Sequence, residues 1–400
     1  MLQRSIQMDV DRVNFCDTIL CFNPRPKRYP GTLAMRTDPT PDSGLTSLVM
    51  VLCLLGPAAA HPASDADIER LRSTAQCQAC DLAGADLSGM RLMSADLRGA
   101  DLRGAKLRKT ILFRADLSRA DLRDADLHRA SLGRVVLNYA NLAGLKLDGA
   151  RLGHAELRGA VLSGSSFNNT MLAHADLSEA DLTGASFNQA VLKNARFDGA
   201  RLTGATFEDA DLSFVDLRKV VDAANVDLRK ARLQNALLDR LSLAGVHLDD
   251  ANLHEASLAD TDLRQASLHK AILRKARLSG ANLGSADLGK ADLTGVKMQG
   301  VKLGAAQLQE AKISGNLIGV DFTEADLSRA DLGGSNLKEA RFAGAVLSQT
   351  NLAACNLYGA DFSGATLHAT VFRRANLRLA RFDGADIDNA DFSDAIGYQP

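Results

Sequence analysis

The chain has 400 residues, of which 47 are Lys or Arg and 48 are Asp or Glu, so its formal net charge at pH 7 is −1. This balance excludes both a strongly basic coat for nucleic acid and a strongly acidic rod that imitates a phosphate backbone. Hydrophobic residues make up 46% of the chain, but aromatic residues only 4%, and Trp is absent. That composition favours a narrow core of small and medium-sized side chains.

Residues 1–34 contain three closely spaced prolines, Pro24, Pro26 and Pro30. An alternative start at Met35 would place the basic residue Arg36 shortly before an apolar run. We therefore expect residues 1–34 to be a disordered extension, or to lie upstream of the true start.

Residues 35–60 have the pattern of a signal peptide. The apolar run at residues 45–55 is followed by Gly56 and Pro57 and then by three alanines, an order typical of cleavage after Ala60. The run is too short for a comfortable membrane span. We expect an exported protein, periplasmic or secreted, with no stable membrane span after cleavage. An uncleaved anchor and a cytoplasmic chain are the alternatives.

Residues 61–79 are predicted to cap the fold. Ser64 followed by Asp65 and Asp67 is a typical helix start, and a short helix here would cover the open apolar end of the following domain. Cys77 and Cys80 come next. In an oxidising compartment the pair is expected to form a disulfide that pins the cap, whereas reduced cap residues and a redox or metal motif are the alternatives.

Residues 80–395 repeat every five positions, as in the run Ala180-Asp181-Leu182-Thr183-Gly184. We call the Leu or Phe of each repeat position i. A period of five fits neither a helix nor a flat strand, because the leucines would not all reach one face. The chain must turn a corner in each repeat, with i and the small residue at i−2 inward and the other positions outward. The prediction is a single all-β solenoid.

The phenylalanines give the size of the coil. Ten of the fourteen occupy position i, in two groups at residues 167–207 and 322–392. Within each group the spacings are multiples of ten, and six pairs lie twenty residues apart. Four repeats per turn would stack residues twenty apart and place residues ten apart on opposite walls. The expected core stack is Phe322, Phe342, Phe362 and Phe382.

Unbroken runs of such units, for example Ala115-Asp116-Leu117 followed by Ala120-Asp121-Leu122, resemble the pentapeptide-repeat family over roughly residues 80–395. The resemblance implies a right-handed quadrilateral β-helix. It says little about activity, because fold does not determine function. Some family members imitate DNA and protect DNA gyrase, but that role needs a strongly negative rod, which this composition does not supply.

No singular polar site stands out. The aspartates at i−1 recur in repeat after repeat, as expected for a solvated surface whose carboxylates hydrogen-bond the corners. His154 and His174 share a wall but lack further ligands. We therefore predict no catalytic residues, no cofactor and no metal.

One wall of the predicted coil is basic and partly apolar. It has Leu92, Leu112 and their equivalents at position i, and only Asp211 opposes its cations. We interpret it as a surface for an acidic partner or an anionic surface, with uneven chance distribution among four walls as the alternative. The candidate residues are Arg91, Arg114, Arg134, Arg151, Lys193, Phe113 and Phe214.

Residues 396–400 form a C-terminal tail too short for a substantial cap. An uncapped last coil exposes strand edges, so a homodimer through the C-terminal coils is expected, as the family resemblance also implies. Alternatively, Ile396 and Tyr398 fold over the end.

These features together predict a non-catalytic exported scaffold that presents β-helix walls to a protein partner whose identity the sequence does not give. Nucleic-acid binding is not expected. The alternative function is a cytosolic DNA-mimic-like protein that binds or protects DNA gyrase.

Overall fold

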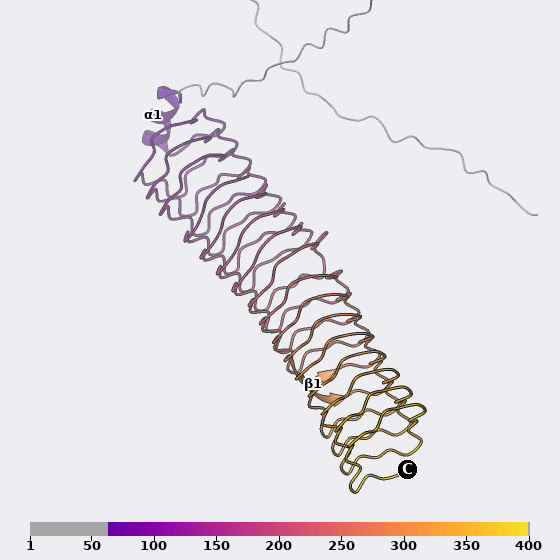
Figure 1. Cartoon of the computed structure of the whole chain (residues 1–400). Helices are drawn as coiled ribbons and strands as arrows, with labels where there is room; N and C mark the ends of the chain where they lie inside the picture. Colours follow the sequence, from indigo (N-terminus) through magenta and orange to yellow (C-terminus); the bar gives the residue numbers. More distant parts are fainter. Residues whose placement is uncertain (1–62, 399–400) are drawn as a thin grey trace, which may run out of the picture. The chain divides into compact units, whose positions relative to one another are not determined.

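The computed structural model describes residues 63–398, which form a stack of similar coils (Figure 1). It has one helix, α1 (Asp65–Thr74), and two short strands, β1 (Asp292–Lys297) and β2 (Lys312–Asn316). The rest of the described chain consists of turns and single-residue bridges. The expectations for residues 1–34 and 35–60 lie outside the described residues.

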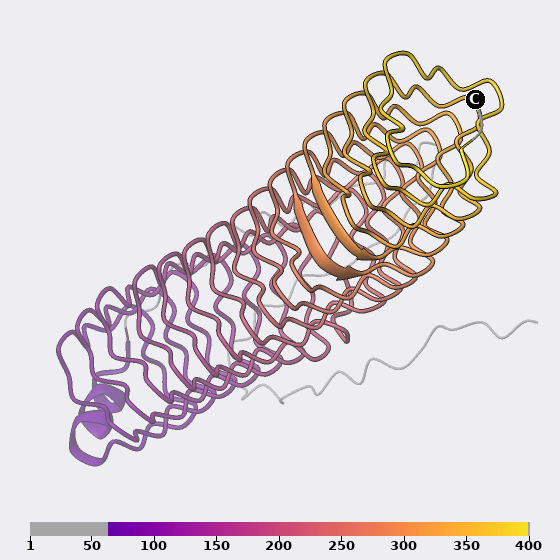
Figure 2. The same ribbon diagram turned by 90° about the horizontal axis from the view of Figure 1, so that it is seen from below.

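An ordinary coil contains twenty residues. Asp81 bridges to Asp101 in parallel, Asp101 bridges to Asp121, and the same step recurs along all four faces. The backbone N–H of Leu82 donates to the Asp101 carbonyl at 2.8 Å, and the Asp101 N–H donates back to Cys80 at 2.9 Å. Because the chain turns a corner in every repeat, most pairings are single bridges, and the stack seen in Figure 2 is held by these ladders.

The corners are β-turns of one kind. The N–H of Ala85 donates to the Leu82 carbonyl at 3.0 Å, and the third turn residue, Gly84, has φ +71°, as in a type II turn. That third residue is position i+2 of the repeat, and it is left-handed even where it is not glycine, for example Arg119 (φ 61°) and His154 (φ 57°). The ladders on both sides of a corner therefore override the ordinary preference for glycine.

The core consists of positions i and i−2, as the period predicts. Leu182 and the Ala180 before it have almost no exposed surface. Phenylalanines twenty residues apart stack with ring centroids 5.0 Å apart for Phe322–Phe342 and 4.8 Å for Phe342–Phe362. Rings ten apart meet edge to face, as Phe362 and Phe372 do at 5.5 Å. Aromatic rings prefer both geometries.

Helix α1 lies at the N-terminal end of the stack (Figure 1). The Ser64 hydroxyl accepts a hydrogen bond from the Asp67 N–H at 3.3 Å and so caps the helix. Leu71 is fully buried, and the Asp67 carboxylate accepts from the Asp81 N–H of the first coil at 3.0 Å. The helix thus covers the apolar end of the first coil.

An extra residue after Leu217 is absorbed as a β-bulge. Val221 donates its N–H to Ala200 at 2.8 Å, while the Asp222 carbonyl accepts from Leu202 at 2.7 Å. In an ordinary repeat, the single residue at i−1 makes both of these hydrogen bonds. Here Val221 and Asp222 make one each, so two residues lie opposite Arg201 alone. Ala223 then occupies position i, beside an apolar cavity of about 10 Å³.

A missing residue between Ile313 and Leu317 is absorbed by tightening a turn. Strands β1 and β2 pair in parallel, but the register skips Gly295, and Gly315 takes the i−2 place with φ 139°. A Cβ on Gly315 would lie 2.7 Å from the carbonyl oxygen of Val296. Only glycine fits this shortened corner.

Candidate partner-binding face

We call the face with Leu92, Leu112, Leu132, Leu152, Leu172, Leu192 and Leu212 at position i the basic face. Its bridging residues run from Arg91 through Ile111, Ser131 and Arg151 to Met171, each paired with the next coil. The corners add Arg114 and Arg134 at the left-handed i+2 position. The structure thus brings the predicted cations Arg91, Arg114, Arg134, Arg151 and Lys193 onto one face.

The cations of this face lack carboxylate partners. Within residues 63–398, none of the five predicted cations has a carboxylate oxygen within 4.0 Å. In several repeats of other faces, an Asp at i−1 binds the Arg at i+1, as in Asp101–Arg103 (2.5 Å) and Asp262–Arg264 (2.7 Å), although corner arginines such as Arg119 have no such partner among the described residues. The basic face carries no acid at i−1 from residue 91 to residue 191, which removes this local partner.

The Asp–Arg pairs explain the abundant aspartates. The Asp101 carboxylate accepts from both the Arg103 guanidinium and the Arg103 N–H, so it also fixes the corner. The hydrogen bond from the Arg103 guanidinium lowers the pKa of the Asp101 carboxyl. These carboxylates are structural parts of the corners.

Exposed apolar side chains accompany the cations. Met93, Met171 and Phe214 are 55%, 50% and 50% exposed. The Arg114 guanidinium carbon lies 5.4 Å from the Phe113 ring centroid, and the Lys193 amine lies 5.3 Å from that of Phe214. Such contacts hold a cation beside an apolar surface. Cations and exposed apolar side chains therefore lie together on the basic face.

His154 and His174 stack on the same face, with ring centroids 4.9 Å apart and planes 5° apart. Within residues 63–398, the one group of side chains close enough to share a metal ion is Asp67, Cys77 and Cys80. The two histidines therefore extend the row of i+2 side chains formed by Arg114 and Arg134.

Cys77 and Cys80 form a disulfide, with Cα atoms 5.3 Å apart. Both are buried, and the Cys77 sulfur lies 3.3 Å from the Asp67 carbonyl oxygen of α1. The pair therefore joins the cap helix to the first coil. Its oxidation state in the cell stays a prediction, as do the alternatives of reduced cap residues and of a redox or metal motif.

The ladder is broken at two places that the sequence analysis missed. Among residues 76–396, the bridges are continuous on every face except between Asp126 and Lys146 and between Asp222 and Ser242. Leu145 directly precedes Lys146, and Leu241 directly precedes Ser242. These two are the only leucines at position i−2, which is usually occupied by a small residue, in the described repeats. A large side chain in an alanine-sized place pushes adjacent coils apart.

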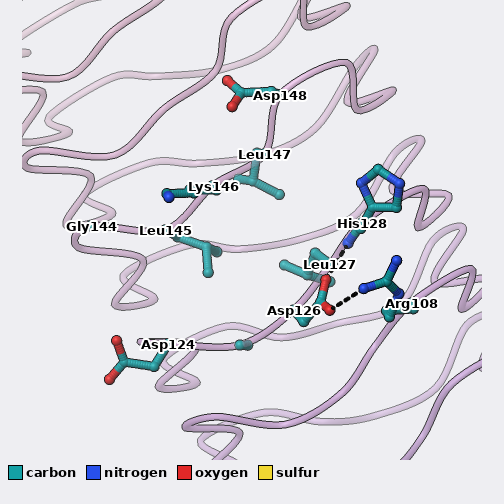
Figure 3. A pocket seen from close by; sticks show the side chains of 11 residues that line it. Arg108, Asp124, Asp126, Leu127, His128, Gly144, Leu145, Lys146, Leu147 and Asp148 are labelled. Atoms are coloured by element: carbon teal, nitrogen blue, oxygen red, sulfur yellow. Dashed lines mark hydrogen bonds and ion pairs between the residues drawn. The ribbon is translucent and has the colours of Figure 1, made fainter.

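The first gap opens a groove of about 520 Å³ (Figure 3). Arg108 reaches across one rim to Asp126 at 3.1 Å, while Asp124 and Lys146 extend into the groove separately. The lining mixes charges of both signs and contains no nucleophile paired with a base.

The buried thiol of Cys355 is also unsuited to chemistry, because burial raises its pKa to about 11.

None of the helices within residues 63–398 has the length and apolar character needed to cross a bilayer.

A family model described as pentapeptide repeats matches eight segments, and a second model of the same description matches residues 172–216. The eight segments are residues 75–112, 115–153, 150–189, 224–265, 247–284, 276–315, 316–353 and 355–394. The chain belongs to the pentapeptide-repeat family. Membership confirms the resemblance read from the sequence and implies a right-handed β-helix.

Several solved pentapeptide-repeat structures are similar to this chain. HetL, involved in heterocyst differentiation regulation in the cyanobacterium Nostoc, is 31% identical, with 56% of this chain and 90% of HetL covered and a TM-score of 0.21. QnrB1, a plasmid-mediated fluoroquinolone resistance protein, is 21% identical, with coverage of 62% and 92% and a TM-score of 0.23. A thylakoid-lumen protein from Arabidopsis thaliana is 26% identical, with coverage of 32% and 69% and a TM-score of 0.11. No curated protein matches the chain.

Proposed function

We propose that this pentapeptide-repeat protein is a non-catalytic scaffold, exported from the cytoplasm, that binds a protein partner on its basic face. The observation that carries the proposal is the set of five cations without carboxylate partners, set among exposed Met93, Met171 and Phe214. Desolvating such a face against an acidic, partly apolar partner gains both charge pairing and apolar burial.

The binding proposal is tested by charge reversal. Arg114→Glu together with Arg134→Glu should abolish retention of the native partner on the immobilised full chain. The control is Arg119→Glu with Arg129→Glu, since these arginines are also exposed, left-handed i+2 residues but lie on other faces. Equal retention by the two double variants would refute binding through the basic face.

Export is supported by the order of apolar run, helix breaker and small residues at 45–60. The intact mass and N-terminal sequence of the protein from its native host test it, together with cell fractionation. A chain beginning near His61 in an exported fraction supports the proposal. An uncleaved cytosolic chain would refute it and favour the alternative, a cytosolic protein that binds or protects DNA gyrase.

A further inference from the structure

Four side chains form a regular row along the basic face. Arg114, Arg134, His154 and His174 occupy the same left-handed i+2 position in four successive coils, with φ of 59°, 56°, 57° and 60°. All four are exposed, and the two imidazoles stack with centroids 4.9 Å apart. We call these four residues the basic row. It presents one nitrogen-bearing side chain per coil on identical backbone geometry.

The neighbouring acids are occupied on their own face. Asp116, Glu156 and Asp176 each follow a member of the row by two residues. Asp116 accepts from the Ser118 hydroxyl at 2.5 Å, Glu156 accepts from the Asn138 amide at 3.1 Å, and Asp176 lies 3.5 Å from Arg196. None of them lies within 4.0 Å of a member of the row, so the row faces outward without internal compensation among residues 63–398.

The spacing of the row discriminates among acidic partners. Four side chains on stacked coils span three steps of about 4.8 Å, or about 14 Å. Three turns of an α-helix span about 16 Å. Carboxylates on one face of a strand span about 20 Å over three steps. The helix differs from the row by about 2 Å, a mismatch that long arginine side chains absorb.

Apolar groups flank the row where a helix would need them. Ile111 and Met171 lie in the adjacent bridging positions, and Phe113 places its ring against Gly133, within 3.2 Å of where a Cβ would be. Beside the next member of the row, Gly153 has only the Ala173 carbonyl oxygen within 4 Å of where a Cβ would be, so this place is left open. An amphipathic helix carries apolar residues next to its acidic stripe and would bury them here.

We propose that the basic row binds one acidic amphipathic α-helix of the partner protein, lying along the stacking axis with about one carboxylate per turn facing each coil. This inference rests on the proposed function and specifies the partner's binding element. The helix bridges four coils at once, so its affinity depends on the register between helical turns and coils.

The experiment uses two synthetic acetylated and amidated 20-residue peptides of identical composition. The first places about six Glu alternately three and four residues apart along one helical face, with Leu and Met beside it. The second places the same number of Glu at alternate residues of one central segment, with the remaining residues unchanged in type and number. Binding to the full chain is measured by fluorescence anisotropy at low salt. We expect the helical-register peptide to bind about tenfold or more tightly than the alternating one, and Arg134→Glu to weaken its binding about tenfold.

Arg119→Glu, at the same corner position on a neighbouring face, should change the affinity less than about twofold. Arg134→Gln provides a second variant if the reversal lowers stability, which thermal unfolding of all three variants monitors. Equal affinity for the two peptides, with the loss on Arg134→Glu retained, would overturn the helix and leave the basic face as the binding surface. Equal effects of Arg134→Glu and Arg119→Glu would overturn both.

Anionic vesicles of phosphatidylglycerol and phosphatidylcholine supply the remaining comparison. Vesicle binding that is lost in Arg134→Glu, together with no discrimination between the peptides, would assign the row to an anionic surface and overturn the helix. Tighter binding of the helical-register peptide, together with no binding to the vesicles, supports the helix as the bound element.

Discussion

At the scale of single residues, backbone conformation is repeated while side-chain identity varies. Arg119, Glu179 and Lys230 all adopt the left-handed conformation that Gly184 adopts, each at position i+2 of its repeat. A left-handed non-glycine residue costs roughly 1–2 kcal/mol, and the inter-coil hydrogen bonds on both sides offset this cost. The corners thus tolerate most side chains, and the surface chemistry of each face can vary without a change of fold.

Gly315 is the exception, because its constraint is steric as well as conformational. Gly315→Ala should lower the free energy of unfolding by about 3 kcal/mol, since the added Cβ meets the Val296 carbonyl at 2.7 Å. Gly184→Ala is the matched control, with φ +64° and no atom within 4 Å of the new Cβ, and should cost about 1 kcal/mol. Denaturant unfolding of both variants measures the difference, and equal losses would contradict the tightened turn.

The Asp–Arg pairs predict a pH dependence. The hydrogen bond from Arg264 lowers the pKa of the Asp262 carboxyl in the folded protein, as Arg103 does for Asp101. A folded-state pKa below the unfolded value of about 3.9 contributes stability above about pH 4 that is lost as the pH falls through the folded-state pKa. The unfolding midpoints of the wild type and Asp262→Asn should therefore differ most near neutral pH and converge in acid. A difference that grows in acid would contradict this sign.

At the scale of elements, the ladder depends on a small residue at i−2. Leu145 and Leu147 are two residues apart, yet Leu145 stands in a small residue's place and Leu147 in the core position. Each gap in the ladder lies next to a leucine at position i−2, Leu145 or Leu241. The same substitution should therefore have opposite consequences at the two positions.

Leu147→Ala should cost about 2–5 kcal/mol, because it removes a buried core side chain. Leu145→Ala should leave stability unchanged or increase it, because the ladder between Asp126 and Lys146 can close. Hydrogen exchange monitors closure through slower exchange of the Leu127 and Lys146 amides. Unchanged exchange in Leu145→Ala would show that the gap has another cause.

The sequence predicted the elements whose cause is local. The period of five, the inward i and i−2 positions and the stacking of Phe322 on Phe342 all follow from which residues need burial. The left-handed arginines were not predicted, because glycine preference suggested otherwise and the opposing ladder hydrogen bonds are not local. The gaps were readable from Leu145 and Leu241, the two leucines in the place of a small residue.

For the candidate site, the sequence correctly placed the cations of the basic face together, because residues separated by multiples of twenty lie on the same face of the stack. Whether the cations are paired depends on neighbours in adjacent coils and on side-chain reach. The absence of partners for Arg114 and Arg134 within the described residues, and the occupation of Asp116 and Asp176, became visible only in the structure.

At the scale of the whole stack, the two ends differ. Helix α1 covers the first coil, whereas the last coil leaves Phe382 and Phe392 partly exposed. Tyr398 stacks on Phe392 with centroids 3.8 Å apart, but Leu379 is 70% exposed and Ile396 50% exposed. The predicted dimer through the C-terminal coils would cover these side chains.

The dimer is tested by Leu379→Lys combined with Ile396→Lys, which places charge on the proposed interface. Light scattering should give twice the chain mass for the wild type at micromolar concentration and the chain mass for the variant. Val221→Lys is the control, since Val221 is 65% exposed at the bulge, far from either end in the sequence. A wild type that stays monomeric across the concentration range would contradict the dimer.

The gaps at Leu145 and Leu241 also bear on cooperativity. Each coil contacts only its two neighbours, so the solenoid behaves as a one-dimensional chain of coupled units. Coupling is weaker wherever one of the four ladders is interrupted. Calorimetry should therefore resolve an early transition confined to coils adjoining a gap, and a protease that requires local opening should cut first near residues 124–151. A leucine in an alanine's place thus sets where a rod of otherwise equivalent coils divides into melting units.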